Sequence, residues 1–226
     1  MSTVRGGAPS TIVDFDDRIL VTGATGFIGS RVVAGLLERG FRNVACFVRR
    51  SSDVTRLTRG LDRHASADVE LVHGSLLSRE DCARAVKGAV LIYHLAANLG
   101  TKSFPDAFMH AVLTTRNLLD AALQEGFFRR FVSMSSFAVY TNRGKAGSAV
   151  LDESSAVEDH PAERGEAYCY AKVKQDELVT EYGRKHGVPY VLVRPGAVYG
   201  PGGAAELLNI PPTTLMSKIK RLGIDR

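Results

Sequence analysis

Short apolar runs alternate along the chain with longer amphipathic stretches. The runs are continuous and rich in branched side chains, which is typical of strands buried on both faces of a sheet, and they lie at residues 19–21, 44–48, 69–72, 90–95, 131–132 and 190–193. Residues 27–39 carry apolar side chains on one face of a helix and end at Gly40, and residues 107–124 and 167–186 have the same character. This alternation predicts an α/β fold with a doubly wound parallel sheet and right-handed crossovers.

Two parts of the chain do not follow this alternation. Residues 141–166 are polar and rich in glycine, serine and acidic side chains, and we interpret them as a long loop after the fifth strand. From Gly196 onward, glycines and prolines punctuate the sequence, and no further strand is predicted.

The composition excludes several classes of protein. The 226 residues are 45% hydrophobic and 23% charged, which argues against intrinsic disorder and against a collagen-like repeat. Cys46, Cys82 and Cys169 are widely spaced, so we expect a reducing compartment and neither a disulfide framework nor a zinc site. The six histidines show no metal-binding spacing, and no metal is expected.

Charge and segment patterning favour a cytoplasmic protein. The formal net charge is +5, but the basic residues are scattered and form no stripe typical of nucleic-acid binding. The amino-terminal segment lacks the apolar region of a secretory signal, and no run approaches 18 consecutive apolar residues. We therefore expect a cytoplasmic location and neither a nucleic-acid nor a membrane partner.

A glycine-rich segment joins the first predicted strand to the first predicted helix. Gly23, Gly26 and Gly29 are three residues apart within residues 22–29. Unpaired N–H groups and the helix dipole make such a helix start an anion site, and glycines let a pyrophosphate approach the backbone. The spacing alone is weak evidence, since a tight turn without a ligand would look the same. Its place between strand and helix favours dinucleotide binding.

The end of the second predicted strand indicates which dinucleotide is bound. An acid about 20 residues beyond the glycines would bind the ribose 2′-hydroxyl of NAD, whereas an arginine accommodates the 2′-phosphate of NADP. Arg49 stands 20 residues after Gly29 and is followed by Arg50. No acid lies between Arg49 and Asp53, and guanidinium pairs well with phosphate, so we favour NADP. The alternative is a solvated pair of surface arginines, with NAD as the cofactor.

A tyrosine and a lysine one helical turn apart provide candidate chemistry. Tyr168 and Lys172 lie at i and i+4, on one face of the predicted helix 167–186. A free tyrosine has a pKa near 10 and is a poor base, but a neighbouring ammonium favours its phenolate. Such a tyrosine exchanges a proton with a substrate hydroxyl or carbonyl while hydride moves to or from a nicotinamide. Tyr170 and Lys174 have the same spacing, which by itself separates neither pair from the other or from a plain surface contact.

Hydroxyl side chains end the fifth predicted strand. Ser135 and Ser136 fall at the carboxyl edge of the sheet, where ligands of doubly wound folds bind. A serine hydroxyl there is able to donate a hydrogen bond to a substrate oxygen as charge develops on it. A serine that only caps a turn is the alternative.

With these motifs in order, the sequence resembles the extended short-chain dehydrogenase/reductase family, also called the NAD-dependent epimerase/dehydratases. The matching segments run through nearly the whole chain, at residues 22–29, 74–76, 94–97, 117–122, 135–140, 168–172 and 194–201. The resemblance implies a Rossmann fold, a Ser/Tyr/Lys catalytic set, and commonly nucleotide-sugar or related carbonyl substrates.

Positions carried over from the family complete the predicted site. The catalytic residues are Ser136, Tyr168 and Lys172, and this Tyr/Lys pair is favoured because an acid is usual four residues beyond the lysine, where Asp176 stands. The segment 195–198 is expected to cover the nicotinamide. The predicted cofactor-binding residues are Gly23, Thr25, Gly26, Phe27, Ile28, Gly29, Arg49, Arg50, Ser75, Leu76, Leu95, Ala96, Ala97, Ser135, Tyr168, Lys172, Pro195, Gly196 and Val198.

Departures from the family pattern bear on function. Ser75 replaces an acid usual near the adenine, and Ala111 replaces an asparagine that many members carry after the fourth strand. The 4,6-dehydratase branch has an Asp-Glu pair after the catalytic hydroxyl, whereas Phe137 and Ala138 stand here, which argues against a dehydratase. We expect either an epimerase, favoured by the Ser-x-x-Val-Tyr segment, or an NADPH-dependent reductase, favoured by the arginines. A regulatory protein that binds NADP without chemistry is a further alternative.

Compared with extended members of this family, the chain is short. Extended members continue well past the Arg-Pro-Gly segment to build a substrate domain, but 30 residues follow Gly196. We expect residues 1–195 to form a dinucleotide-binding Rossmann domain, and residues 196–226 to form the start of an incomplete, apparently truncated substrate-binding domain. The family also suggests a homodimer formed through helices 107–124 and 167–186.

Overall fold

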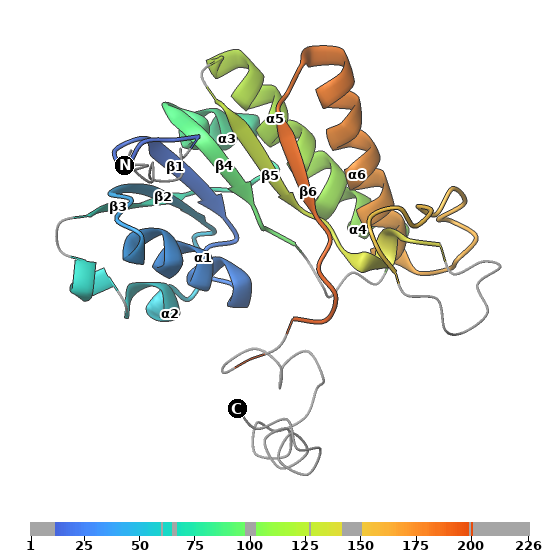
Figure 1. Ribbon diagram of the computed structural model, residues 1–226, viewed down its shortest axis with the longest axis horizontal. Coiled ribbons are helices and arrows are strands. Elements are labelled where there is room, and N and C mark those ends of the chain that lie inside the picture. The colour runs from blue at the N-terminus through green and yellow to red at the C-terminus, as the bar shows by residue number, and fades with distance from the viewer. Residues whose placement is uncertain are drawn as a thin grey trace, which may run out of the picture.

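Helices cover both faces of a parallel β-sheet (Figure 1). This computed structural model describes residues 12–59, 61–64, 67–97, 103–126, 128–141, 151–198 and 200, apart from the side chains of residues 62 and 63. Within them, six parallel strands lie in the order β3-β2-β1-β4-β5-β6, with the bounds Arg18–Thr22 (β1), Asn43–Val48 (β2), Asp68–His73 (β3), Ala89–His94 (β4), Arg130–Met134 (β5) and Tyr190–Val193 (β6). The predicted doubly wound parallel sheet is confirmed.

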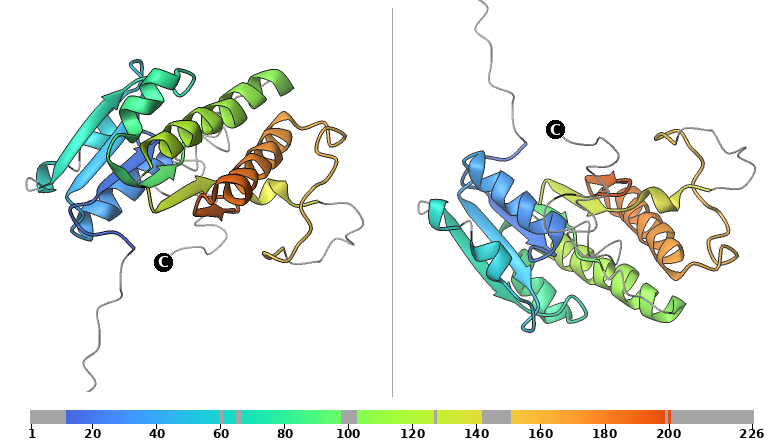
Figure 2. Two further views of the ribbon diagram at one scale, coloured as in Figure 1. Left: turned by 90° about the horizontal axis from the view of Figure 1, so that it is seen from above. Right: turned by 90° about the horizontal axis from the view of Figure 1, so that it is seen from below.

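The helices alternate with the strands, and α1 and α2 lie on one face of the sheet while α3, α5 and α6 lie on the other (Figures 1 and 2). Their bounds are Phe27–Glu38 (α1), Thr55–Thr58 (α2), Arg79–Val86 (α3), Phe104–Phe108 (α4), Thr114–Glu125 (α5) and Ala167–His186 (α6). A π-helical turn at Met109–Leu113 joins α4 to α5, and 3-10 turns lie at Leu61–His64 and Phe137–Val139. The predicted helix 107–124 therefore begins earlier and contains a wide turn.

Helix α3 lies outside the amphipathic stretches that the apolar pattern identifies. Its sequence is mostly charged, and it buries only Cys82, Ala85 and Val86. The signal for its start is polar, because the Ser78 side chain accepts a hydrogen bond from the Asp81 N–H as an N-cap.

Successive residues of the central strands enter two separate cores. Leu20 of β1 packs in one cluster with Ile92, Phe131 and buried residues of α3, α5 and α6. Its neighbours Ile19 and Val21 pack in the other cluster, against α1. Burial on both faces explains why β1 reads as a continuous apolar run.

The two edge strands depart from the prediction of burial on both faces. In β3 only Val72 is buried. In β6, Tyr190 and Leu192 pack against the core that contains α5 and α6, whereas Val191 and Val193 are exposed. The apolar runs identified the strands correctly, but hydrophobicity does not say whether a second layer covers a face.

All strands end at one edge of the sheet because they are parallel, and the strand order reverses between β1 and β4. Thr22 at the end of β1 pairs with His94 at the end of β4. Chains that leave these two strands diverge, and ligands of open α/β sheets bind in the resulting crevice.

Several predictions concern parts that the structure leaves untested. In the region 196–226, residue 199 and residues 201–226 lie outside the described residues, so the incomplete substrate domain stays a prediction, as does the homodimer. Among the described helices, none combines the length and the hydropathy that crossing a bilayer requires.

Candidate functional site

A cleft of about 1160 Å³ lies at the carboxyl edge of the sheet, between the glycine turn after β1 and the start of α6. The predicted residues that line it are Gly23, Thr25, Gly26, Phe27, Ile28, Gly29, Arg49, Ser75, Leu76, Leu95, Ala96, Ala97, Ser135, Ser136, Tyr168, Lys172, Pro195, Gly196 and Val198. Segments distant in the sequence therefore meet around one space, although their role in cofactor binding stays a prediction.

Arg50 is the exception among the predicted site residues. It is exposed and is not one of the residues that line the cleft, whereas Arg49 is. Strand β2 ends at Val48, and the Ser52 N–H donates to the Arg49 carbonyl oxygen at 2.9 Å, so the two arginines lie in a turn. Of the two arginines, Arg49 is the one that lines the cleft, and a role of either in cofactor binding stays a prediction.

The glycine turn brings backbone groups to the cleft. Helix α1 begins after Gly26 with no side-chain cap and no acid in its first turn, which leaves its first N–H groups for an anion. A Cβ at Gly29 would lie 2.1 Å from the Gly23 carbonyl oxygen, so helix and turn are in contact. Gly23 itself has a φ of 69°, in the left-handed region. The local structure fits a dinucleotide pyrophosphate.

Replacing Gly29 by alanine is expected to push α1 away from the turn, because the methyl group meets backbone atoms that cannot yield easily. We expect a loss of about 1–3 kcal/mol in the free energy of unfolding, together with weaker dinucleotide binding. Thermal unfolding and a dinucleotide titration measure both effects.

The matched control is Gly35→Ala in the same helix. The added Cβ there meets only the flexible Arg39 side chain, at 3.1 Å, so we expect stabilisation by about 0.5–1 kcal/mol from the lower chain entropy of alanine. Equal behaviour of the two variants would contradict the close contact at Gly29.

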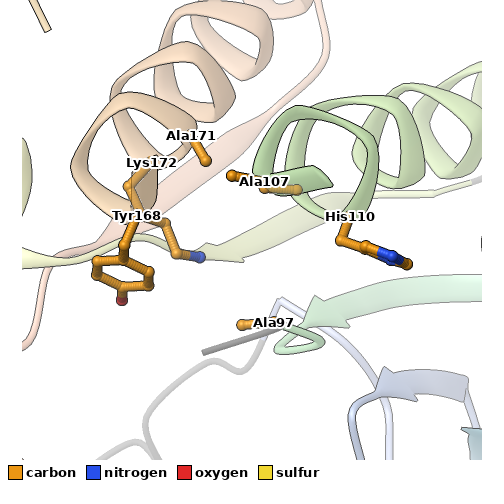
Figure 3. Close-up of a pocket in the computed structure, with 7 residues that line it drawn as sticks. Ala97, Ala107, His110, Tyr168, Ala171 and Lys172 are labelled. Atoms are coloured by element: carbon orange, nitrogen blue, oxygen red, sulfur yellow. The ribbon is translucent and has the colours of Figure 1, made fainter. Parts of the chain in front are cut away.

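Tyr168 and Lys172 leave the first turns of α6 on the same side and line the cleft, with His110 and Ala97 across from them (Figure 3). The other Tyr/Lys pair lies elsewhere. The Tyr170 ring packs edge-on against Phe104 at 5.1 Å between centroids, and Lys174 forms an ion pair with Glu177 at 2.7 Å. Helical spacing left both pairs open, and the tertiary structure places only Tyr168 and Lys172 in the cleft.

The two serines at the end of β5 have different hydrogen bonds. The Ser135 hydroxyl donates to the Asp176 carboxylate at 2.8 Å, so its proton is already used. The Ser136 oxygen accepts from the Ala138 N–H at 3.2 Å. Within the described part of the chain its O–H has no acceptor, and Ser136 is therefore the serine that is able to donate into the cleft.

Lys172 is 2% exposed, and its ammonium donates to the Met134 carbonyl at 2.7 Å and to the Gln175 side-chain oxygen at 2.8 Å. Burial lowers the pKa of Lys172 to about 8, and the nearby Asp176 carboxylate partly opposes that change. Burial raises the pKa of Asp176, while its contacts with Ser135 and Arg194 act to lower it. Lys172 therefore remains mostly positive at neutral pH.

His94 lies directly behind the cleft, with both ring nitrogens hydrogen-bonded. Nδ1 is 2.8 Å from the Thr22 hydroxyl, and Nε2 is 2.9 Å from the Thr115 hydroxyl. Thr115 donates its own proton to the Ala111 carbonyl at 2.6 Å, so its oxygen must accept, and His94 carries its hydrogen on Nε2. Burial lowers the pKa of His94 to about 3, which keeps the ring neutral.

The cleft also contains residues that the sequence did not single out. They are Phe47, Val48, Ser52, Leu77, His110, Thr114, Met134 and Phe137. The Nε2 atom of His110 lies 3.3 Å from the Asp106 carboxylate one turn earlier. That i, i+4 spacing is visible in the sequence, but it did not indicate a cleft position.

The sequence matches the model of one protein family and several curated proteins. The family model described as "NAD dependent epimerase/dehydratase family" matches residues 19–221. Cinnamoyl-CoA reductase 1 of Oryza sativa subsp. japonica is 32% identical over 185 residues, which cover 81% of this chain and 54% of that protein. The chain spans about half the length of the curated relatives it matches.

Two solved structures are similar over most of the described fold. Vestitone reductase from alfalfa (Medicago sativa) is 28% identical with a TM-score of 0.66, covering 78% of this chain and 56% of that one. The dTDP-glucose 4,6-dehydratase DesIV from Streptomyces venezuelae, solved with NAD, is 28% identical with a TM-score of 0.70, covering 84% of this chain and 58% of that one.

Proposed function

Because the chain belongs to the NAD-dependent epimerase/dehydratase family, we propose that it binds NADPH in the cleft and reduces a carbonyl carbon of a small molecule. One observation carries the proposal: Tyr168 and Lys172 from α6 and Ser136 from the end of β5 line the same cleft as the uncapped start of α1. A regulatory protein that only holds a dinucleotide would not need this set of side chains.

The chemistry divides among the three side chains. When bound, the nicotinamide supplies a hydride to the carbonyl carbon. The Tyr168 hydroxyl gives its proton to the carbonyl oxygen, and the Ser136 hydroxyl donates a hydrogen bond to the same oxygen as negative charge develops there. The positive charge on Lys172 favours the phenolate that Tyr168 becomes when its proton leaves.

Reduction is favoured over epimerisation by the cofactor end of the cleft and by the relatives. Arg49 lines the cleft after β2 and supplies a guanidinium where a 2′-phosphate would need one. The relative from rice and the structure from alfalfa are both named as reductases. The related family members named after nucleotide sugars make a sugar nucleotide the second substrate class to test.

Replacing Arg49 by alanine is expected to weaken NADPH binding by about tenfold or more, because a charge-assisted hydrogen bond to the 2′-phosphate is lost. NADH binding should change little, since NADH lacks that phosphate. Titrations followed by the fluorescence of the reduced nicotinamide measure both affinities. The control is Arg50→Ala, which is expected to bind both dinucleotides as the wild type does. Equal wild-type affinities for NADPH and NADH would contradict the role of Arg49.

Turnover tests the reaction itself. The purified chain is offered a cinnamoyl-CoA thioester or an aromatic ketone with NADPH, and UDP-glucose with NADP⁺ or NAD⁺, in separate assays. Net oxidation of NADPH with either of the first two compounds is the expected result. Conversion of UDP-glucose to its epimer without net reduction of the oxidised cofactor would support an epimerase instead, and tight NADPH binding without turnover would favour the regulatory alternative.

A further inference from the structure

A buried chain of hydrogen bonds runs from Lys172 on α6 back to β4. The Lys172 ammonium donates to the Gln175 side-chain oxygen at 2.8 Å, and the Gln175 side-chain nitrogen donates to the Thr115 hydroxyl at 2.8 Å. That hydroxyl also lies 2.9 Å from His94 Nε2. Gln175, Thr115 and His94 are each at most 1% exposed, so water does not compete for these bonds.

The direction of each bond is determined by the groups themselves. An ammonium has three donors and no acceptor, so the oxygen of the Gln175 amide must face Lys172 and its NH₂ must face Thr115. Thr115 is able to accept there because its own proton goes to the Ala111 carbonyl. The Gln175 amide therefore has one orientation that satisfies both of its neighbours.

A small recess of about 10 Å³ lies on the other side of Lys172, roughly the space of one water molecule (Figure 3). Besides Tyr168 and Lys172, its walls include Ala107, Ala111 and Ala171. Position 111 offers only a methyl group to these walls. No side-chain amide reaches Lys172 from that wall, while an amide on α6 does.

We propose that Gln175 is a positioning residue that holds the Lys172 ammonium against the end of β5. Its carboxamide and the Met134 carbonyl occupy two of the three ammonium donors, which leaves one for a ligand in the cleft. The inference rests on the proposed function for what Lys172 does during the reaction, but not for how Lys172 is held.

The test is the titration of Lys172 in cofactor-free protein, followed by NMR of ¹³C-labelled lysine side chains, with the signal assigned from its absence in Lys172→Met. Gln175→Leu removes the acceptor and is expected to lower the pKa of Lys172 from about 8 by about one unit, a tenfold change in the ionisation constant. Gln175→Glu keeps the volume, places a carboxylate at the ammonium, and is expected to raise the pKa.

Apart from position 175, neither variant replaces a titratable group near Lys172. The titratable groups around the ammonium are Tyr168 and Asp176 on α6, His94 on β4 and His110 on the π-helical turn, which lines the recess with Lys172. The matched control is Glu177→Gln, an exposed position on the same helix that pairs with Lys174, and it is expected to leave the Lys172 titration unchanged. Opposite shifts in the Leu and Glu variants cannot arise from packing alone.

An unchanged Lys172 pKa in folded Gln175→Leu would overturn the proposal. If that variant fails to fold, Gln175→Glu decides, because an unshifted pKa with a carboxylate at this position means that the side chain does not contact the ammonium. NADPH titration of the wild type is a separate measurement, which tests the proposed function. A protein that binds no NADPH but shows both pKa shifts would refute the proposed function and leave the role of Gln175 intact.

Discussion

Replacing Tyr168 by phenylalanine is expected to lower kcat by about 10²–10⁴-fold while NADPH binding stays close to that of the wild type. Only the hydroxyl is removed, so the ring still forms its part of the cleft wall. The carbonyl oxygen then lacks its proton donor, although Ser136 still donates a hydrogen bond. NADPH oxidation with the carbonyl compound that the wild type reduces best measures kcat, and a fluorescence titration measures binding.

Tyr170→Phe is the matched control, two residues away on the same helix. Its ring packs against Phe104 outside the cleft lining, so near-wild-type turnover is expected. If Tyr170→Phe lost turnover and Tyr168→Phe kept it, the other Tyr/Lys pair would be the catalytic one. If both variants kept it, neither tyrosine would act as the proton donor.

Acid is expected to destabilise this protein through His94. Burial lowers the pKa of the His94 ring in the folded state from the ordinary 6.5 to about 3. Between these two pH values the ring is protonated in the unfolded chain and neutral in the folded chain. Stability contributed by the neutral ring is complete above pH 6.5 and is lost as the pH falls toward 3. At pH 5 the loss is about 2 kcal/mol, since each pKa unit corresponds to about 1.4 kcal/mol.

Urea unfolding of the wild type and of His94→Gln at pH 7 and pH 5 measures this loss. The variant is expected to be less stable at pH 7, because it disturbs the contacts with Thr22 and Thr115. It should nevertheless lose about 2 kcal/mol less than the wild type between the two pH values. His73→Gln at an exposed position of β3 serves as the control and should follow the wild type. A parallel loss in His94→Gln would show that other groups cause the acid sensitivity.

Local patterns predicted the parts of the site in which neighbours along the chain act together. The glycine turn could be identified because strand, turn and helix start are contiguous, and the Tyr168/Lys172 pair because one helical turn separates its members. Spacing did not distinguish this pair from Tyr170/Lys174. That distinction depends on partners from other elements, because Tyr168 and Lys172 line the cleft while the Tyr170 ring packs against Phe104 of α4.

The sequence pattern did not predict contacts between segments that are distant in the chain. Gln175 and Thr115 are 60 residues apart in sequence, and neither belongs to a motif that suggests their hydrogen bond. The different roles of Ser135 and Ser136 depend in the same way on Asp176, which reaches β5 from α6. The sequence assigns Arg49 and Arg50 together to the cofactor site from their place after the second strand, and the turn after β2 brings Arg49 but not Arg50 to the lining of the cleft.

The sequence by itself determined the α/β alternation and the strand positions, because hydrophobic periodicity is a local property of the chain, and the family resemblance supplied the candidate catalytic side chains. The tertiary structure decided which faces of β3 and β6 are covered, which Tyr/Lys pair lines the cleft, and how Lys172 is held. These outcomes depend on burial and on partners from other elements, and a side chain has neither until the sheet and helices have assembled around it.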